Sequence, residues 1–359
     1  MKSLTYVYPM HAINSFHIIS KHHIEHLSKK IKVNEVDENT LDNIIWGKGK
    51  KVLLHPIGYL LLGDKIEYFA HRIKRLYKLK ECCKLVGGFD TADSDRIANI
   101  FVKVLNQLDL IVVPSTWAKE CYVNSGVIKP IEVLPHGVGN AFLQNYKVVE
   151  NEVIRKLAEI KRKNKAILVL FFLQHSGFRK GADIVFNVLN KLQDEYDNVY
   201  LVVKTGNIED PYLFWLKQLK TIHIKGHLNE KELVQLYDQC DILICPSRGG
   251  GFELNALEGI ARGLITLVPS EMCFRDYSQY AITLKCDTKV KVLPGNPIHV
   301  GYGYQVSLAD FYKKMVKVLD NIQKYKKVFR KNAKEVRKKY AWKTICNKLF
   351  LLLSKYGFV

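Results

Sequence analysis

Short apolar segments with strand character alternate with amphipathic helical segments through both halves of the chain, and this alternation constrains the fold more than any other feature. In the first half, strands are predicted at 5–8 and 110–114, with helical patterns at 15–31 and 93–108. The second half repeats the alternation from the apolar run at 166–173 onward. Strands that alternate with helices predict parallel sheets covered by helices on both faces.

We therefore predict an α/β protein of two Rossmann-like domains that face each other across a cleft. The first domain is expected over residues 1–143 and the second over 166–339, with a polar, Lys/Glu-rich linker at 144–165. A C-terminal helix at 340–359 is a candidate to pack back on the first domain. With 359 residues, each domain is large enough for its own core. Ligands of such sheets bind at the carboxyl ends of the strands.

Composition excludes several classes of protein. Apolar residues make up 48% and charged residues 25% of the chain, as in soluble globular proteins. No apolar run is long enough to span a bilayer, and the N-terminus lacks the apolar core of a signal peptide, so we expect a cytoplasmic protein. The eight cysteines form no Cys-x-x-Cys pair, which predicts free thiols rather than structural zinc.

The formal net charge of +20 is the strongest compositional signal. Basic blocks occur at 65–84 and 324–343, and the first has apolar residues at the spacing of one helical face. Such faces attract nucleic acid, anionic membrane surfaces or phosphorylated substrates. A solvated Lys-rich helix gives the same pattern, and the apolar stripe of the first block could pack on a sheet or dock on a membrane. These alternatives stay open.

Residues 245–263 carry the clearest sign of a ligand site. An apolar strand runs into three glycines, Gly249, Gly250 and Gly251, and then into a helix with Glu258. Glycine backbone can approach a ligand closely, and amides at a helix start favour anions. A carboxylate one turn further on suits the diol of a ribose. The order predicts a nucleotide-diphosphate site, whereas the glycines alone would indicate only a tight strand-to-helix turn.

A second polar loop follows the predicted strand at 166–173. It contains Arg179 and Lys180, which can place positive charge beside diphosphate oxygens where a leaving group gains negative charge. The alternative is a basic turn at the end of a strand.

The glycine loop resembles the donor-site signature of glycosyltransferase family 4, whose members have the GT-B fold and transfer a sugar from a nucleotide-sugar with retention of configuration. That signature usually reads Glu-Gly-Phe-Gly-Leu-Pro-Xaa-Xaa-Glu. Gly251, Phe252, Leu254 and Glu258 are in register with it. Gly250 stands in place of the first Glu, Glu253 in place of the second Gly, and Asn255 in place of the Pro.

The resemblance extends over residues 85–343. Lys180-Gly181 matches the family pattern, with His175 at the position of the usual Arg, and residues 113–142 follow the pattern of strand-Pro-Ser, helix, Ser-Gly-Val and Pro-His-Gly-Val. The resemblance implies that Lys180 and Arg179 act on the diphosphate without a metal or cofactor. It also implies that Glu253 stands in for the sugar-facing carboxylate.

The remaining candidates are implied less directly. The resemblance assigns His175, Gly226, Gly250, Gly251 and Phe252, together with Glu258, to donor binding. Asp90 follows a predicted strand in the first half and is a candidate to accept the proton of the acceptor hydroxyl. Asp93 or Ser94 is expected to cap the next helix, and His136 is interpreted as structural.

The sequence thus predicts a glycosyltransferase that uses a nucleotide-diphosphate sugar and a glycan, lipid-linked or protein acceptor, with peripheral attachment to an anionic membrane as an option. Alternatives are an epimerase, a phosphorylase or an inactive transferase that binds sugar nucleotides. A basic nucleic-acid-binding protein is a further alternative, although no helix-turn-helix or finger motif is visible.

Overall fold

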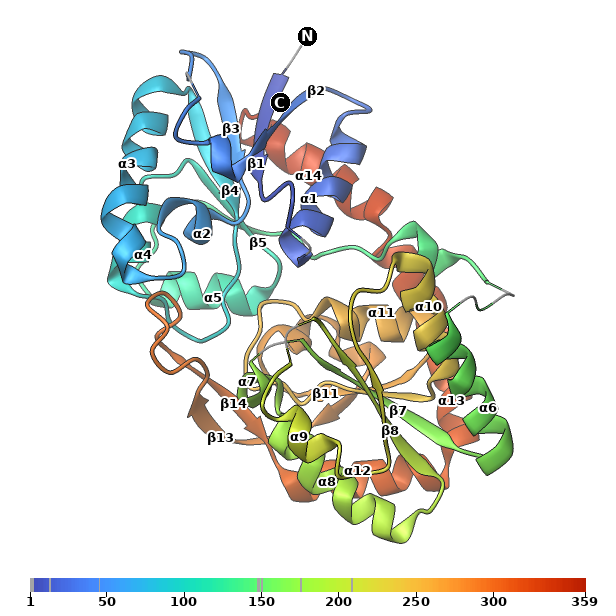
Figure 1. Ribbon diagram of the computed structural model, residues 1–359. Helices are drawn as coiled ribbons and strands as arrows, with labels where there is room; N and C mark the ends of the chain where they lie inside the picture. The colour runs from blue at the N-terminus through green and yellow to red at the C-terminus, as the bar shows by residue number, and fades with distance from the viewer. Residues whose placement is uncertain are drawn as a thin grey trace. The chain divides into compact units, whose positions relative to one another are not determined.

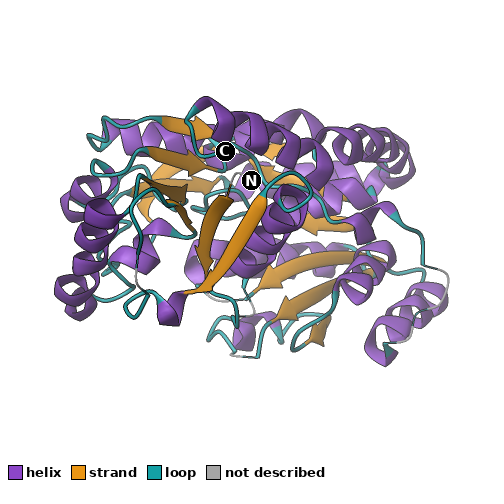
Figure 2. Ribbon diagram, turned by 90° about the horizontal axis from the view of Figure 1, so that it is seen from above, coloured by secondary structure: helices purple, strands orange, loops and turns teal. Residues whose placement is uncertain are grey.

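The fold consists of two compact units, each built on a parallel sheet of six strands (Figure 1). A computed structural model describes residues 3–12, 14–44, 46–146, 149, 151–174, 176–207 and 209–359. The first unit comprises Met1–Gly137, Leu293–Tyr302 and Trp342–Val359, and the second comprises Val138–Val292 and Gly303–Ala341. Within the units, helices flank the strands (Figure 2).

The first unit has the strand order β2-β1-β3-β4-β5-β6, with parallel pairing throughout. Its strands are β1 (Ser3–Tyr8), β2 (Lys32–Asp37), β3 (Lys51–Leu54), β4 (Leu85–Phe89), β5 (Leu110–Val113) and β6 (Ile131–Val133). Its helices are α1 (Ser15–Leu27), α2 (Ile57–Leu61), α3 (Ile66–Cys82), α4 (Asn99–Leu105), α5 (Thr116–Asn124) and α14 (Trp342–Lys355), with a 3-10 turn η1 (Glu38–Thr40).

The second unit has the strand order β12-β11-β10-β7-β8-β9, again with parallel pairing. Its sheet contains β7 (Ile167–Leu173), β8 (Val199–Thr205), β9 (Thr221–Ile224), β10 (Ile242–Ile244), β11 (Ile265–Pro269) and β12 (Ile282–Leu284). A separate two-stranded sheet is formed by β13 (Cys286–Lys291) and β14 (Tyr302–Val306). The helices are α6 (Glu152–Asn164), α7 (Gly177–Lys180), α8 (Ala182–Glu195), α9 (Leu213–Leu216), α10 (Glu230–Gln239), α11 (Leu254–Arg262), α12 (Leu308–Asp320) and α13 (Ile322–Lys339), with 3-10 turns η2 (Asn140–Leu143) and η3 (Met272–Tyr280).

The strand order of the second unit fixes where a ligand can bind. Counted from β7, the order is that of a dinucleotide-binding Rossmann sheet, and it reverses between β7 and β10. The connections that follow these two neighbouring strands leave the sheet in opposite directions, which opens a crevice at their carboxyl ends. Residues 176–181 and 245–253 follow these two strands.

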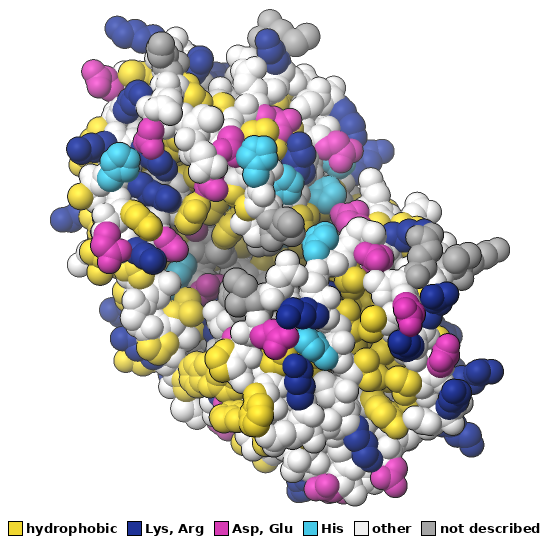
Figure 3. Space-filling view, viewed as in Figure 1, with side chains coloured by type: hydrophobic (Ala, Val, Ile, Leu, Met, Phe, Trp, Pro, Cys, Tyr) yellow, Lys and Arg dark blue, Asp and Glu magenta, His cyan; other side chains and the backbone are white. Residues whose placement is uncertain are grey.

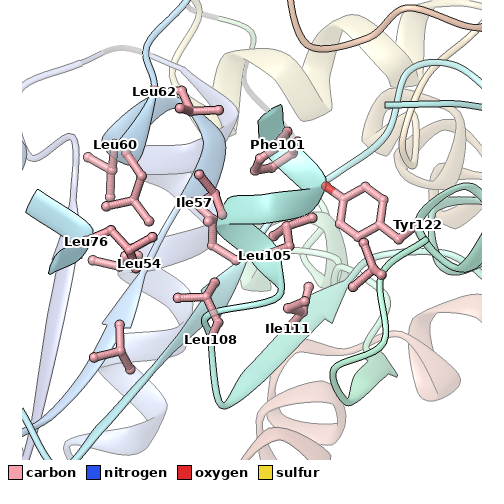
Figure 4. Packing of buried hydrophobic residues seen from close by; sticks show 14 of the residues in the cluster. Leu54, Ile57, Leu60, Leu62, Leu76, Phe101, Leu105, Leu108, Ile111 and Tyr122 are labelled. Carbon is pink, nitrogen blue, oxygen red and sulfur yellow. The ribbon is translucent and has the colours of Figure 1, made fainter. Parts of the chain in front are cut away.

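Each sheet is the centre of its own hydrophobic core. In the first unit, Ile57, Leu60, Phe101, Leu105 and Tyr122 come from helices and lie with strand residues in one buried cluster (Figure 4). A second cluster surrounds β7 and β8 in the second unit. The central strands carry near-continuous apolar runs because both faces of each sheet are covered there, whereas the edge strand β2 is polar.

The units differ from the predicted domain ranges at the linker and at Leu293–Tyr302, whereas the C-terminal helix lies in the first unit, the place for which it was a candidate. The predicted linker contains α6, which packs on α10 and belongs to the second unit. The segment Leu293–Tyr302 belongs to the first unit, where Ala98 N donates to Ile298 O at 2.8 Å. Helix α14 also belongs to the first unit, where Trp342 stacks on His22 of α1 with ring centroids 4.8 Å apart. No short sequence motif indicates that residues 293–302 return to the first unit, and the polarity of residues 144–165 does not indicate it either.

Two local predictions have different outcomes. Ser115 caps α5 as predicted, because its Oγ accepts from Ala118 N at 3.2 Å. The predicted helix at 93–108 is shorter, since α4 begins at Asn99 and its N-cap is Ala98, which makes no side-chain cap. The prediction that Asp93 or Ser94 caps this helix was therefore wrong. Ser94 Oγ instead donates to Arg96 O at 2.8 Å within the preceding loop.

The apolar stripe of α3 packs mainly into the core of the first unit. Leu76 and Leu79 are buried, and Phe69 and Ile73 pack against the same cluster, whereas Ile66 is 70% exposed. On the face drawn in Figure 3, Lys and Arg side chains are dispersed among acidic and apolar ones. Among the described residues, no helix has the length and apolar character required to cross a membrane.

Three histidines of the first unit are held neutral. Tyr6 Oη lies 2.9 Å from Nδ1 of His23 and 3.3 Å from Nδ1 of His55. Burial, together with the charges of neighbouring histidines, places the pKa values of His23 and His55 well below the ordinary range. Burial also lowers the pKa of His136 to about 3.

We predict that the first unit loses stability as the pH falls below about 6.5. The unfolded chain then binds protons that the native histidines exclude, and each histidine removes about 1.4 kcal/mol per pH unit. Burial raises the pKa of Asp90 to about 7, so the native protein binds a proton at Asp90 that the unfolded chain does not bind. This proton offsets the destabilising effect of one histidine. Urea unfolding at pH 7 and pH 5 measures the slope. His23→Gln should reduce it by about one proton, and an unchanged slope would contradict this assignment.

Candidate functional site

The loops after β7 and β10 pack tightly against each other in the second unit. Arg179 and Lys180 end the short helix α7, and Glu253 immediately precedes α11. A Cβ atom at Gly181, which has a φ of +78°, would lie 2.4 Å from the carbonyl oxygen of Pro246. Glycine is therefore required where the first loop passes the second, and this close approach brings Lys180 to Glu253.

Lys180 and Glu253 form the central ion pair of the site. Lys180 Nζ lies 2.7 Å from Oε1 and 2.6 Å from Oε2 of Glu253, whose side chain is 3% exposed. Arg179 Nη1 is 3.8 Å from Oε1, and Ser247 Oγ donates to the same oxygen at 3.1 Å. The sequence analysis predicted Lys180, Arg179 and Glu253 as catalytic residues, and the structure brings all three together.

Glu253 is ionised in this environment. Burial raises its pKa, but the charges of Lys180 and Arg179 outweigh burial, so the pKa lies below the usual value. An ionised carboxylate can accept hydrogen bonds from sugar hydroxyls and stabilise positive charge, but it cannot donate a proton at neutral pH.

Gly250 leaves room for the Glu253 carboxylate. A Cβ atom at position 250 would lie 2.7 Å from Oε1 of Glu253. Glu253 itself has a φ of +57°, a left-handed conformation that favours glycine. The side chain of residue 253 thus fills the space into which a side chain at 250 would point. Relative to the sequence signature, the Gly and the Glu have exchanged positions, and the Glu253 carboxylate lies directly beside Gly250.

Arg248 braces the glycine loop and was not predicted from the sequence. Its guanidinium donates to both carboxylate oxygens of Asp183 at 2.7 Å and to Gln305 Oε1 at 2.7 Å, and it lies 4.0 Å from the ring centroid of Phe178. Arg248 N also donates to Arg179 O at 2.7 Å. The Arg248 side chain is 2% exposed, so its hydrogen bonds hold the two loops together from the interior of the unit. The sequence contained one hint of this role, because Arg248 stands directly before the three glycines of the loop.

Gly251 and Phe252 are buried in the same loop. The Phe252 carbonyl oxygen accepts from Tyr277 Oη at 2.8 Å, and the two rings lie 5.7 Å apart. These contacts fix the backbone that leads into α11.

Glu258 lies one turn into α11 and contacts α10. Tyr237 Oη donates to Glu258 Oε2 at 3.0 Å. Burial raises the pKa of Glu258 to about 8, even though the Tyr237 hydrogen bond lowers it, and the charge of Glu230 contributes to the rise. Glu258 is therefore mostly protonated at pH 7, unlike Glu253.

The two remaining residues that were predicted to bind the donor are Gly226 and His175. Gly226 follows β9 with a φ of +92°, and its carbonyl oxygen accepts a hydrogen bond from Lys204. His175 lies outside the described residues. Within the described parts of the chain, no group of three or more His, Cys, Asp or Glu residues could hold a metal ion.

Asp90 lies at the carboxyl end of β4 in the first unit and is 7% exposed. Its Oδ2 accepts from Gly58 N at 2.5 Å and its Oδ1 from Thr91 N at 2.6 Å. The carboxyl therefore holds the start of α2, a structural task that the sequence did not indicate.

Comparisons with known proteins agree with this geometry. Residues 153–277 match the sequence family described as "Glycosyl transferases group 1", and this range contains the Lys180–Glu253 pair and Glu258. The chain contains a glycosyltransferase domain. The enzyme class predicted from the sequence, glycosyltransferase, is thereby confirmed.

Two relatives come from viruses of Sulfolobus islandicus. Protein 356 of rod-shaped virus 1 is 28% identical over 365 residues, which cover 99% of each chain. "Putative glycosyltransferase 45" of the filamentous virus is 30% identical over 246 residues, which cover 67% of this chain and 65% of the relative.

A solved structure shares the fold. Anabaena HepE in complex with UDP-glucose aligns with a TM-score of 0.67 and 11% identity over 99% of this chain and 100% of that chain. The two parallel six-stranded sheets therefore confirm the predicted GT-B fold.

We predict that the affinity for a nucleoside diphosphate rises between pH 7 and pH 9. If Glu258 binds the ribose as expected from the sequence, the ribose hydroxyls would donate to its ionised form. The pKa of Glu258, about 8, lies within this range, so the gain would be at most about tenfold per pH unit below that pKa. Calorimetric titration measures it. Glu258→Gln should weaken binding and remove the pH dependence. Glu253→Gln is the control, and its affinity should keep the pH dependence of the unmodified protein. If the affinity of Glu258→Gln also kept this pH dependence, Glu258 would be excluded from the ribose site.

Proposed function

We propose that the protein transfers a sugar from a nucleotide-diphosphate sugar to an acceptor hydroxyl with retention of anomeric configuration. The observation that carries the proposal is the cluster of Lys180, Arg179 and Glu253 at the carboxyl ends of β7 and β10. Two cations and one ionised carboxylate suit a reaction in which a diphosphate leaves and positive charge develops on the sugar.

Lys180 and Arg179 stabilise the leaving diphosphate. Two of the three Lys180 ammonium donors are directed at Glu253, which leaves one for a phosphate oxygen. Because these cations supply the positive charge, we propose that no metal ion is needed and expect activity to persist in EDTA. Complete loss of activity in EDTA that Mg²⁺ restores would contradict this part of the proposal.

Glu253 faces the sugar and orients Lys180. It remains ionised, so it accepts hydrogen bonds from sugar hydroxyls and stabilises the oxocarbenium-like transition state instead of acting as an acid. The leaving phosphate accepts the acceptor proton, as the resemblance to family 4 implies. Asp90, whose carboxyl is occupied by two backbone amides, then serves the acceptor side by holding the α2 loop.

Lys180→Ala should reduce turnover by ten- to a hundredfold. A charge-assisted hydrogen bond contributes about 1.5–3 kcal/mol, and each 1.4 kcal/mol is a factor of ten. Release of nucleoside diphosphate from a panel of nucleotide-sugars, with and without sugar acceptors, measures turnover and separates transfer from epimerisation or phosphorolysis. Lys191→Ala on the exposed face of α8 is the control, and a Lys180→Ala enzyme with normal turnover would place the diphosphate elsewhere.

We also propose that α3 contributes to peripheral attachment at an anionic membrane, where lipid-linked acceptors lie. Most apolar side chains of α3 are packed in the core of the first unit. The contact with the membrane would therefore be made by Lys74, Lys78 and the exposed side chains of Ile66 and Tyr77. Each basic residue near such a surface adds about 1 kcal/mol.

Vesicle flotation tests this attachment. Reversal of charge in Lys74→Glu/Lys78→Glu should reduce flotation with phosphatidylglycerol vesicles at least tenfold, while Lys327→Glu/Lys331→Glu on α13 should reduce it less. Equal loss in both double variants would indicate attraction by net charge alone. Absence of flotation by the unmodified protein would exclude attachment.

A further inference from the structure

A buried lysine lies beside the candidate donor site and has no role in the ion pair described above. Lys204 is the penultimate residue of β8, and its side chain is buried at 3% exposure. Its ammonium donates to the carbonyl oxygens of Thr205, at 2.7 Å, and of Gly226. It therefore joins the loop after β8 to the loop after β9.

The charge of Lys204 is not neutralised by a neighbouring acid. Among the residues that the structure describes, Lys204 makes no ion pair, and both of its acceptors are neutral carbonyls. Burial lowers its pKa, as expected for an ammonium in apolar surroundings. An ammonium has three N–H donors, and the described residues supply acceptors for two of them, the carbonyl oxygens of Thr205 and Gly226. A buried donor without an acceptor is costly, so a ligand oxygen beside it would be bound favourably.

The surroundings of Lys204 match the nucleoside end of the donor site. Lys204 is paired with Phe172 of β7 and so lies on the same face of the sheet. The Phe172 ring lies 5.6 Å from the ring of Tyr237, which donates to Glu258. The diphosphate residues follow β7 and β10, while Lys204 and Gly226 are at the ends of β8 and β9. A nucleotide with its ribose at Glu258 would have its base near these last two strands.

We propose that Lys204 donates its remaining N–H to the base of the donor at the position that carries a keto oxygen in uracil (O4) and guanine (O6) and an amino group in cytosine and adenine. This proposal rests on the proposed nucleotide-sugar donor and specifies it further. An ammonium can only donate, so it pairs with the keto oxygen of uracil or guanine and leaves the amino group of cytosine or adenine unpaired. The donor is then a uridine or guanosine diphosphate sugar, and Lys204 determines this specificity.

Matched nucleoside diphosphates test the proposal by calorimetric titration. UDP and CDP differ at one exocyclic position, where a keto oxygen replaces an amino group, and IDP and ADP differ in the same way. The unmodified protein should bind the keto member of at least one pair ten times more tightly or better, since a hydrogen bond from a charged donor is replaced by an unpaired contact. Lys204→Met should reduce this ratio to about twofold or less. Lys225→Met is the matched control. Lys225 directly follows β9 and precedes Gly226, but it pairs with Glu209 at the surface at 3.1 Å, so this variant should keep the ratio.

The outcomes separate this inference from the proposed function. If the unmodified protein binds none of the four diphosphates, the nucleotide-sugar proposal fails. If it binds them without a keto preference, or if Lys204→Met keeps the preference, the base-reading role of Lys204 is overturned while the donor site stands. Should Lys204→Met fail to fold, the ratios measured for the unmodified protein alone decide between a keto preference and none.

Discussion

The ion pair between Lys180 and Glu253 is the interaction on which the site depends. It joins the loops that follow β7 and β10, the two strands at which the order of the second sheet reverses. A carboxylate that is 3% exposed is stable as an anion only because Lys180 and Arg179 compensate its burial. The pair therefore holds the two loops together, and Lys180 and Arg179 place two positive charges where the diphosphate is expected.

The rest of the second unit supports this pair. Arg248 locks the glycine loop to α8 through Asp183, and the missing Cβ atoms of Gly181 and Gly250 allow the loops and the carboxylate to approach each other. On the nucleoside side, Glu258 and Lys204 differ from Glu253 in one respect. Their charged forms are disfavoured by burial, which leaves them free to respond to a ligand. The proposed donor site thus combines a charged cluster after β7 and β10 with two groups, Glu258 and Lys204, whose charged forms burial disfavours.

Much of this arrangement could be predicted from the sequence. The alternation of apolar strands with helices is sufficient for two parallel sheets, and β7 (Ile167–Leu173) covers all but the first residue of the apolar run predicted at 166–173. Strand β2 was missed because its sequence, Lys32-Val-Asn-Glu-Val-Asp, is polar, as suits an edge strand with little burial. The return of residues 293–302 to the first unit depends on long-range hydrogen bonds that leave no local pattern. At the site, Lys180, Arg179 and Glu253 were predicted by residue. The way in which Glu253 replaces a carboxylate at position 250 could not be predicted, because it depends on a left-handed backbone conformation.

A double-mutant cycle between Lys180 and Glu253 tests the central claim most directly. The measured quantity is kcat/KM with a nucleotide-sugar for Lys180→Met, Glu253→Gln and the double variant. If the two side chains act as one unit, the double variant should be no more than about threefold worse than the poorer single variant, which corresponds to a coupling of about 0.7 kcal/mol or more when each single loss is tenfold or greater. Losses that multiply in the double variant would show that the residues act independently and would contradict the account.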